Sequence, residues 1–320
     1  MRVFFLVLTQ MLMMALLILV GYVLRKKKIV PENTGIVLSK LETFVFVPAL
    51  NVINQLNYCT IENLKKTSIL ILYGFILILV AIGIAYPVSR LFVPKADGDS
   101  ALMYQRNIYK YAITFGNYGF MGNFIVLGIW GDEMLFKYTM FTFVVTIFCN
   151  VWGLYILIPK ENSVSIGENL KKGLLAPPII AIAVGIVCGL LNLKSYFPDF
   201  VLTAFDNASK CMGPCAMLLA GIIIGGYDLK KLFSNIKVYI ITFLRLIVIP
   251  CVFICVLKFF GINKEILTLT IIAFATPLGM NTIVFPAAYG GDTKTGASMT
   301  VISNILSIIT IPLMYYVFIV

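Results

Sequence analysis

IAFATPLGMNTIVFPAAYGG, residues 272–291, is apolar enough and long enough to cross a bilayer. Its middle, however, carries Pro277, Gly279 and the polar side chains of Asn281 and Thr282. Because proline removes a backbone donor and clashes with the preceding turn, a helix here is predicted to break near its centre. Backbone groups that a break frees cost several kcal/mol each in hydrocarbon unless protein or water satisfies them. We therefore expect this segment to face a cavity and not lipid.

A second segment, ITFGNYGFMGNFIVLGIWG at residues 113–131, aligns with the first without a gap. In this alignment Asn117 falls on Thr276, and Asn123 falls on Thr282. Two interrupted apolar segments at matching places in two halves of a chain point to the binding site of a transporter. The candidate substrate-binding residues are those at the two predicted breaks: Asn117, Gly119, Gly122, Asn123, Thr276, Pro277, Asn281 and Thr282.

The composition predicts an all-α integral membrane protein. Of the 320 residues, 60% are hydrophobic and 12% are charged, and the mean hydropathy is +0.98. This length leaves room for about ten spans of roughly 20 residues with short loops, so we expect one transmembrane domain over residues 1–320. The net charge of +11 is explained by basic loops between spans, and we do not expect nucleic acid as a partner.

Loop charges predict how the spans are oriented. The loops after odd-numbered spans hold roughly twice as many Lys and Arg residues as the opposite loops, beginning with Arg25–Lys28, which favours both termini outside the cytoplasm. Five spans per half is an odd number, so the halves are predicted to form an inverted 5+5 repeat, about 1–160 and about 171–320. The ten predicted spans cover about 4–24, 33–54, 67–92, 107–130, 134–159, 173–193, 200–226, 238–260, 264–289 and 294–320.

Several further polar residues lie inside predicted spans and are candidate supporting or coupling groups: Lys40, Glu42, Asn51, Asn150, Asp206, Lys210 and Arg245. Ionisable side chains are costly at this depth and are functional candidates by default. The alternatives are a Lys40–Glu42 pair, a Lys210–Asp206 pair one turn apart, and a structural tie of Arg245 to backbone carbonyls. Glu42 and Asp206 are the candidate proton-binding groups, while broken-helix carbonyls could supply a sodium site. Proton coupling, sodium coupling and uniport are all compatible with these residues.

Several motifs resemble those of the auxin efflux carrier family of membrane transport proteins, which includes bacterial malate and malonate permease-like members. The motifs are Pro48-Ala49-Leu50, Asn117-x-Gly119-Phe120-Met121-Gly122, Thr276-Pro277, Ala287-Ala288-Tyr289-Gly290-Gly291-Asp292, Ala297-Ser298, Val301-Ile302-Ser303, Leu306-Ser307 and Thr310-Ile311-Pro312. The resemblance covers the whole chain, and its motifs are specific in combination and weak singly.

The resemblance implies a ten-helix inverted-repeat fold in which the broken fourth and ninth spans cross, an architecture shared with sodium–bile-acid symporters and cation–proton antiporters. It also implies that a small organic anion, a carboxylate, binds beside the crossing and moves by an elevator-like displacement. Half-helix N-termini present unpaired N–H groups and partial positive charge, which suits a carboxylate. The chain departs from the family at Phe124, where proline is usual, and at Asn304, where threonine is. The break in the fourth span is therefore expected to depend on Gly116, Gly119 and Gly122.

Other functions receive less support from the sequence. With no His, no paired acidic motif and no glycine-rich phosphate loop, we expect neither an enzyme nor a resident cofactor. Six of the seven cysteines lie in apolar segments, so we expect them to pack and not to bind metal. The alternatives are a sodium-coupled symporter of the bile-acid type and a non-transporting membrane sensor or scaffold. The expected partners are a small organic anion, a proton or Na⁺, and the lipid of the plasma membrane; glycine-rich spans are also compatible with a homodimer.

Overall fold

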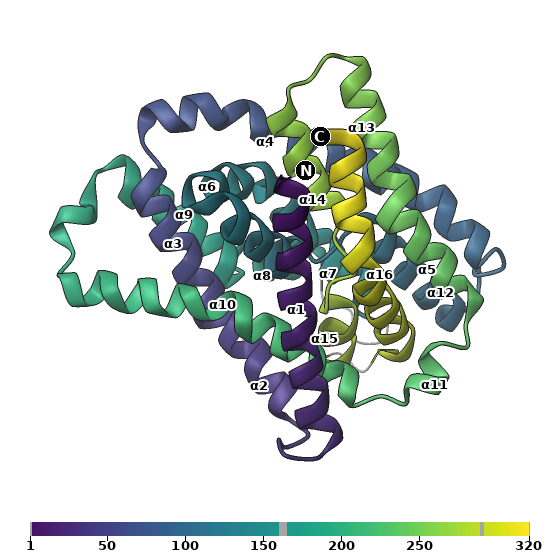
Figure 1. Cartoon of the computed structure of the whole chain (residues 1–320). Helices are drawn as coiled ribbons and strands as arrows, with labels where there is room; N and C mark the ends of the chain where they lie inside the picture. The colour runs from purple at the N-terminus through teal and green to yellow at the C-terminus, as the bar shows by residue number, and fades with distance from the viewer. Residues whose placement is uncertain (1, 160–164, 289–290, 320) are drawn as a thin grey trace.

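The protein is a bundle of helices (Figure 1), and the computed structural model describes residues 2–159, 165–288 and 291–319. No strand occurs within those ranges. The first half contains α1 (Arg2–Lys26), α2 (Thr34–Leu41), η1 (Glu42–Phe46), α3 (Val47–Tyr58), α4 (Ile61–Phe92), α5 (Ser100–Thr114), η2 (Tyr118–Gly122), α6 (Asn123–Phe148), η3 (Cys149–Gly153) and α7 (Leu154–Leu157). The second half contains α8 (Ile166–Leu174), α9 (Pro177–Leu190), η5 (Leu193–Tyr196), α10 (Asp199–Gly225), α11 (Leu229–Leu232), α12 (Ile236–Phe243), η6 (Leu244–Val248), α13 (Ile249–Phe259), α14 (Lys264–Phe274), α15 (Asn281–Ala288) and α16 (Lys294–Ile319).

Many of these helices suit a membrane. Among the described residues, seven helices are long and apolar enough to cross one, or eight when the bent pair α8 and α9 counts as one span. One of the seven stretches covers 58 residues from Ser100 to Leu157, more than one crossing needs, and it is interrupted at residues 115–117 between α5 and η2. Gly131 divides it, because its φ of 78° and ψ of −170° turn the chain inside α6, a conformation that glycine adopts readily.

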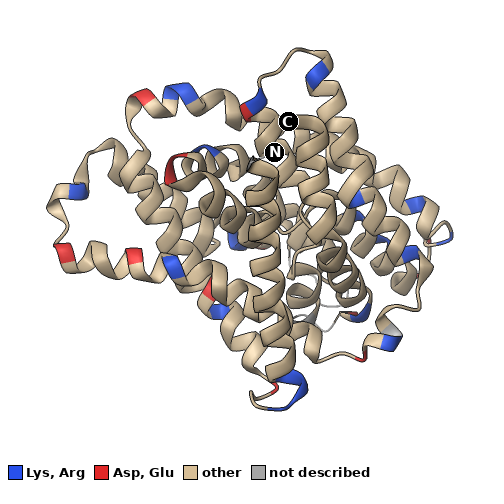
Figure 2. Ribbon diagram, in the orientation of Figure 1, with Lys and Arg blue, Asp and Glu red and all other residues tan. Residues whose placement is uncertain are grey.

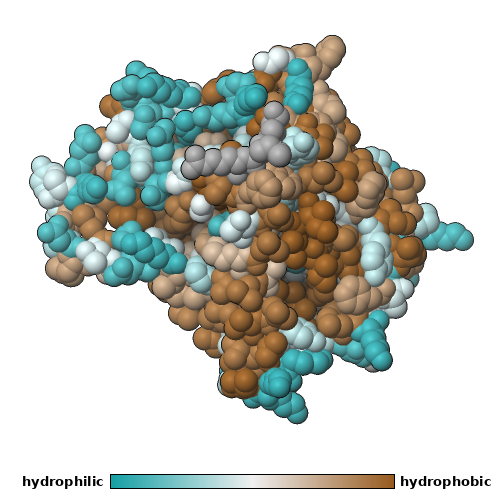
Figure 3. All heavy atoms as spheres, in the orientation of Figure 1, coloured by the Kyte–Doolittle hydropathy of each residue, from teal (hydrophilic) through white to brown (hydrophobic). Residues whose placement is uncertain are grey.

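The outer surface is apolar. Large side chains such as Leu16 on α1 (60% exposed) and Ile309 on α16 (69% exposed) point away from the protein. Figure 3 shows hydrophobic residues over the centre of the face that includes α1 and α16, with hydrophilic residues on its left side and around its edges. Figure 2 shows most Lys, Arg, Asp and Glu residues in loops and at helix ends. This distribution is consistent with an integral membrane protein.

The helices pack in two sets, and each set takes elements from both halves of the sequence. Helices α1–α3, α9 and α10 pack chiefly on one another, and we call them the panel helices. Helices α4–α7 and α12–α16 pack chiefly on one another, and we call them the core helices. Within the panel, α1 and α10 can approach closely because Gly21 and Gly221 have no Cβ. A Cβ at either position would collide with a carbonyl oxygen of the other helix.

Both predicted helix breaks are present. Helix α5 ends at Thr114, Phe115 is extended (φ −115°, ψ 131°), and a π-helical turn, η2, begins at Tyr118. Helix α14 ends at Phe274, and helical structure resumes only at Asn281, the first residue of α15. Of the three glycines expected to cause the first break, only Gly116 lies in it, since Gly119 and Gly122 belong to η2.

Candidate functional site

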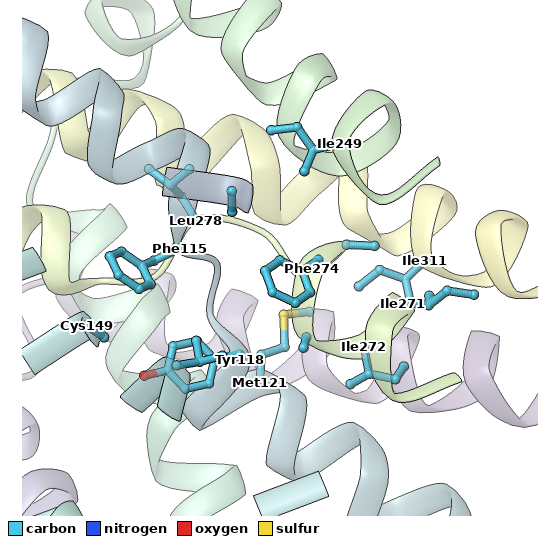
Figure 4. Close-up of a cluster of buried hydrophobic side chains, with 14 of the residues drawn as sticks. Phe115, Tyr118, Met121, Cys149, Ile249, Ile271, Ile272, Phe274, Leu278 and Ile311 are labelled. Atoms are coloured by element: carbon cyan, nitrogen blue, oxygen red, sulfur yellow. The ribbon is translucent and has the colours of Figure 1, made fainter. Parts of the chain in front are cut away.

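The two breaks lie against each other. The backbone N–H of Asn117 donates to the carbonyl oxygen of Pro277 across 2.6 Å. The backbone N–H of Leu278 donates to Ser303 Oγ of α16 across 2.9 Å. Figure 4 shows the apolar side of this crossing, where Phe274 and Leu278 of one segment belong to the same buried cluster as Phe115 and Met121 of the other. Groups of the protein therefore form hydrogen bonds with backbone atoms that lost their helical partners at the breaks. Such bonds are required where no water is present.

A cavity of about 120 Å³ lies beside the crossing, between the panel and the core helices. Both helix beginnings that follow the breaks face it, through Tyr118–Phe120 and through Gly279–Asn281. The other lining residues are Thr43, Val47 and Asn51 of the panel, Pro178 and Ile182 of α9, and Gly116, Asn117, Asn123, Thr139, Thr142, Thr146, Cys149, Asn150 and Phe285 of the core.

The electrostatics of this cavity favour an anion. No side chain among its described lining residues carries a charge. The first N–H groups of a helix have no partner within the helix, and a helix N-terminus is equivalent to roughly half a positive elementary charge. The N-terminal ends of two helical segments face this cavity. Carboxylates and phosphates bind at helix N-termini in many proteins.

Two asparagines supply free side-chain donors. Asn117 and Asn123 line the cavity and are 4% and 7% exposed. Among the described residues, neither side-chain amide has a hydrogen-bond partner. Because both side chains face the cavity and make no hydrogen bond to the described part of the protein, their N–H groups are available to a ligand, and a hydrogen bond to a charged acceptor is stronger than one between neutral groups.

The other predicted asparagines are already engaged at the cavity wall. Asn281 Nδ2 donates to Tyr111 Oη across 3.0 Å and lies 3.5 Å from Cys149 Sγ. Asn51 Nδ2 donates to the Pro178 carbonyl oxygen across 3.3 Å, and Asn150 bonds within its own helix. These contacts orient the amides; Asn51 and Asn150 each use one of their two N–H donors in this way.

The remaining residues predicted at the breaks do not line the cavity. Thr276 Oγ1 donates to the carbonyl oxygen of Ala273 across 3.4 Å, and Thr282 Oγ1 donates to that of Gly279 across 3.1 Å. Pro277 contributes its carbonyl oxygen to the crossing, and Gly122 packs where a Cβ would collide with the hydroxyl of Tyr138. These residues therefore stabilise the two breaks by local hydrogen bonds and packing, without lining the cavity.

A row of threonines was missed by the sequence reasoning. Thr139, Thr142 and Thr146 follow one another at helical spacing on α6, and Asn150 continues the row one turn later. Each threonine hydroxyl donates to the carbonyl oxygen four residues earlier, across 2.8 to 3.0 Å. This polar face in an otherwise apolar span was the signal that could have found them.

The charged candidates lie away from the cavity. Lys210 Nζ pairs with Asp206 Oδ2 across 2.6 Å on the outside of α10, which confirms the pairing considered above. Lys40 is exposed and borders a separate surface pocket with Arg25. Glu42 is fully buried in η1, and neither of its oxygens has a partner among the described residues, so the Lys40–Glu42 pair is not formed.

Arg245 is also fully buried and does not line the cavity. Its guanidinium donates hydrogen bonds to backbone carbonyls at the ends of α5 and α14. Arg245 is therefore tied to the backbone, one of the two roles that the sequence left open, and it does not reach the cavity.

Comparison with known proteins identifies the family. The family model described as "Membrane transport protein" matches residues 6–171 and 163–315. An uncharacterized transporter of Methanocaldococcus jannaschii is 24% identical over 314 residues, which cover 94% of this chain and 96% of the relative. An uncharacterized transporter of Methanothermobacter thermautotrophicus is 23% identical over 93% of each chain, and the uncharacterized transporter YfdV of Escherichia coli K12 is 24% identical over 62% of this chain and 64% of its own. The chain thus belongs to the membrane transport protein family, the auxin efflux carriers that its motifs resemble.

Proposed function

We propose that this membrane transporter is a secondary carrier for a small organic anion that has at least one carboxylate group. The observation that carries the proposal is the pair of helix beginnings, Tyr118–Phe120 and Gly279–Asn281, that face one uncharged cavity. Their positive ends attract a carboxylate, and the free amides of Asn117 and Asn123 add donors. No acidic side chain among the described lining residues opposes the anion.

We further propose ten spans in an inverted 5+5 repeat. Support comes from ten helical runs: α1, α2–α3, α4, α5–α6 as far as Gly131, α6–α7 beyond it, α8–α9, α10, α12–α13, α14–α15 and α16. Both termini lie at the same end of the molecule in Figure 1, which an even number of spans requires.

Transport by this route needs one set of helices to move past the other. The core helices carry both breaks and most of the cavity lining, while the panel helices close the remaining wall through Thr43, Val47, Asn51, Pro178 and Ile182. In the proposed elevator, the core helices carry the anion along a fixed panel, so that the cavity opens to either side in turn.

The excess of Lys and Arg in the loops after odd-numbered spans supports an orientation in the plasma membrane with both termini outside the cell. In whole cells, an impermeant maleimide is expected to label Glu62→Cys, at the exposed start of α4, and to spare Glu32→Cys, in the loop after α1. The reverse pattern would show that the orientation is inverted.

Counterflow into proteoliposomes tests the carrier. Vesicles preloaded with malonate are expected to accumulate labelled malonate, while choline and glycerol, which lack a negative charge, serve as matched solutes and do not exchange. Stabilisation by malonate in a thermal-shift assay without any exchange would instead support a sensor or scaffold. Exchange that requires Na⁺ would favour a symporter of the bile-acid type. If a series of mono- and dicarboxylates neither binds nor exchanges, the proposed substrate class is wrong.

A further inference from the structure

Arg245 bridges the C-terminal ends of the two interrupted helices. It is fully buried on the π-helical turn η6. Its Nη1 donates to the carbonyl oxygens of Ile113 and Thr114, across 3.3 and 3.2 Å, and its Nη2 donates to the carbonyl oxygen of Ala273 across 3.4 Å. These carbonyls belong to the last turns of α5 and α14, the two helices that end at the breaks.

The surroundings hold the guanidinium in place without a counter-ion. Gly116 leaves the necessary space, because a Cβ there would collide with Arg245 Nη2. The ring of Phe274 lies 5.9 Å from Arg245 Cζ, within the range of a cation–π contact. Among the described residues, Arg245 forms no salt bridge with an acidic side chain. Backbone dipoles therefore supply its charge compensation.

The positive charge of Arg245 is offset by the partial negative charges at the C-terminal ends of α5 and α14. Each helix C-terminus is equivalent to roughly half a negative elementary charge, so two ends offset the single positive charge of an arginine. Arginine keeps that charge in proteins and its five N–H groups suit several oxygen acceptors at once. In carriers with broken helices, such carbonyls and helix ends are also the groups that coordinate Na⁺. In this protein the guanidinium of Arg245 already forms hydrogen bonds with these carbonyl oxygens.

We propose that Arg245 is a built-in cation that takes the place of a coupling cation at the crossing, so that the anion binds without Na⁺ or K⁺. Arg245 is a positioning residue, since it lies outside the cavity lining and acts through the two interrupted segments. By neutralising their negative ends, it leaves the positive ends at Tyr118 and Asn281 to face the anion. This inference rests on the proposed carrier function and adds its ion dependence.

Malonate binding in different salts tests the inference on the purified full-length protein. Isothermal titration in NaCl, KCl and N-methylglucamine chloride at equal ionic strength is expected to give wild-type affinities within about twofold of one another. For Arg245→Gln, the affinity in N-methylglucamine is expected to fall about tenfold or more and to recover in Na⁺ or in about 10 mM guanidinium. A purely structural role would not produce this dependence on the cation.

The outcomes separate this inference from the carrier proposal. A wild-type protein that binds malonate only with Na⁺ would overturn the built-in cation and leave the carrier standing. Failure to bind malonate and other carboxylates in every salt would overturn the carrier proposal itself. Equal loss of affinity in all salts for folded Arg245→Gln would also overturn the built-in cation. If that variant does not fold, Arg245→Lys takes its place: it keeps the charge, so binding is expected without Na⁺, and a Na⁺ requirement would refute the inference.

Discussion

Truncation of Asn117 is expected to weaken anion binding without weakening the fold. The Asn117→Ala change removes a buried amide that has no partner among the described residues, while the backbone N–H keeps its hydrogen bond to Pro277. A hydrogen bond to a charged group contributes about 1.5–3 kcal/mol. At about 1.4 kcal/mol for each factor of ten, the affinity for malonate should fall by roughly 10- to 150-fold.

Isothermal titration of the purified protein measures this change, and counterflow of labelled malonate measures its effect on transport. Asn207→Ala is the matched control, because Asn207 is exposed on α10 and does not line the cavity; its affinity should stay within about twofold of the wild type. Asn117→Asp should lose more affinity than Asn117→Ala, since it places a negative charge beside the carboxylate. If Asn117→Ala binds malonate as tightly as the wild type does, the amide does not contact the anion and the cavity argument fails.

Three further changes test the supports of the site. Ser303→Ala removes the buried acceptor of the Leu278 N–H, so the unfolding free energy should fall by about 1–3 kcal/mol, measured by thermal or denaturant melts; an unchanged value would mean that another group takes over the hydrogen bond. Gly122→Ala should reduce folded yield because its Cβ meets the Tyr138 hydroxyl, and the double variant with Tyr138→Phe should recover part of that yield; no recovery would place the conflict elsewhere. Glu42→Gln should keep or raise the melting temperature, because neither side-chain oxygen has a partner to lose among the described residues and an amide cannot ionise in the buried site; a clear drop would reveal a partner for the carboxyl group.

The sequence was sufficient to predict the class of the protein and where its helices fail. Long apolar runs must be helical in a bilayer, because no water is present to satisfy an open backbone. Pro277 and the glycine-rich segment around Asn117 contradict that requirement locally, and both segments are interrupted in the structure. These properties depend on local chemistry, so they can be recognised without knowing which helices are neighbours.

The lining of the cavity could not be predicted in the same way. Asn117 aligns with Thr276 and Asn123 with Thr282, yet the asparagines line the cavity while the threonines bond to their own backbone. The two segments meet face to face, so equivalent positions look toward different neighbours. Hydropathy and spacing contain no information about that contact.

The roles of the charged residues also depended on the tertiary structure. Along the chain, Lys210 and Arg245 both appear as isolated cations inside apolar spans. In the fold, Lys210 lies on the outside of α10 with Asp206, whereas Arg245 lies between the carbonyl ends of two helices that are more than 100 residues apart in the sequence. The sequence by itself therefore determined the membrane helices and their breaks, which follow from backbone hydrogen bonding. Only the tertiary structure decided which polar groups face a ligand, because partners distant in the chain set the cost of burying each charge.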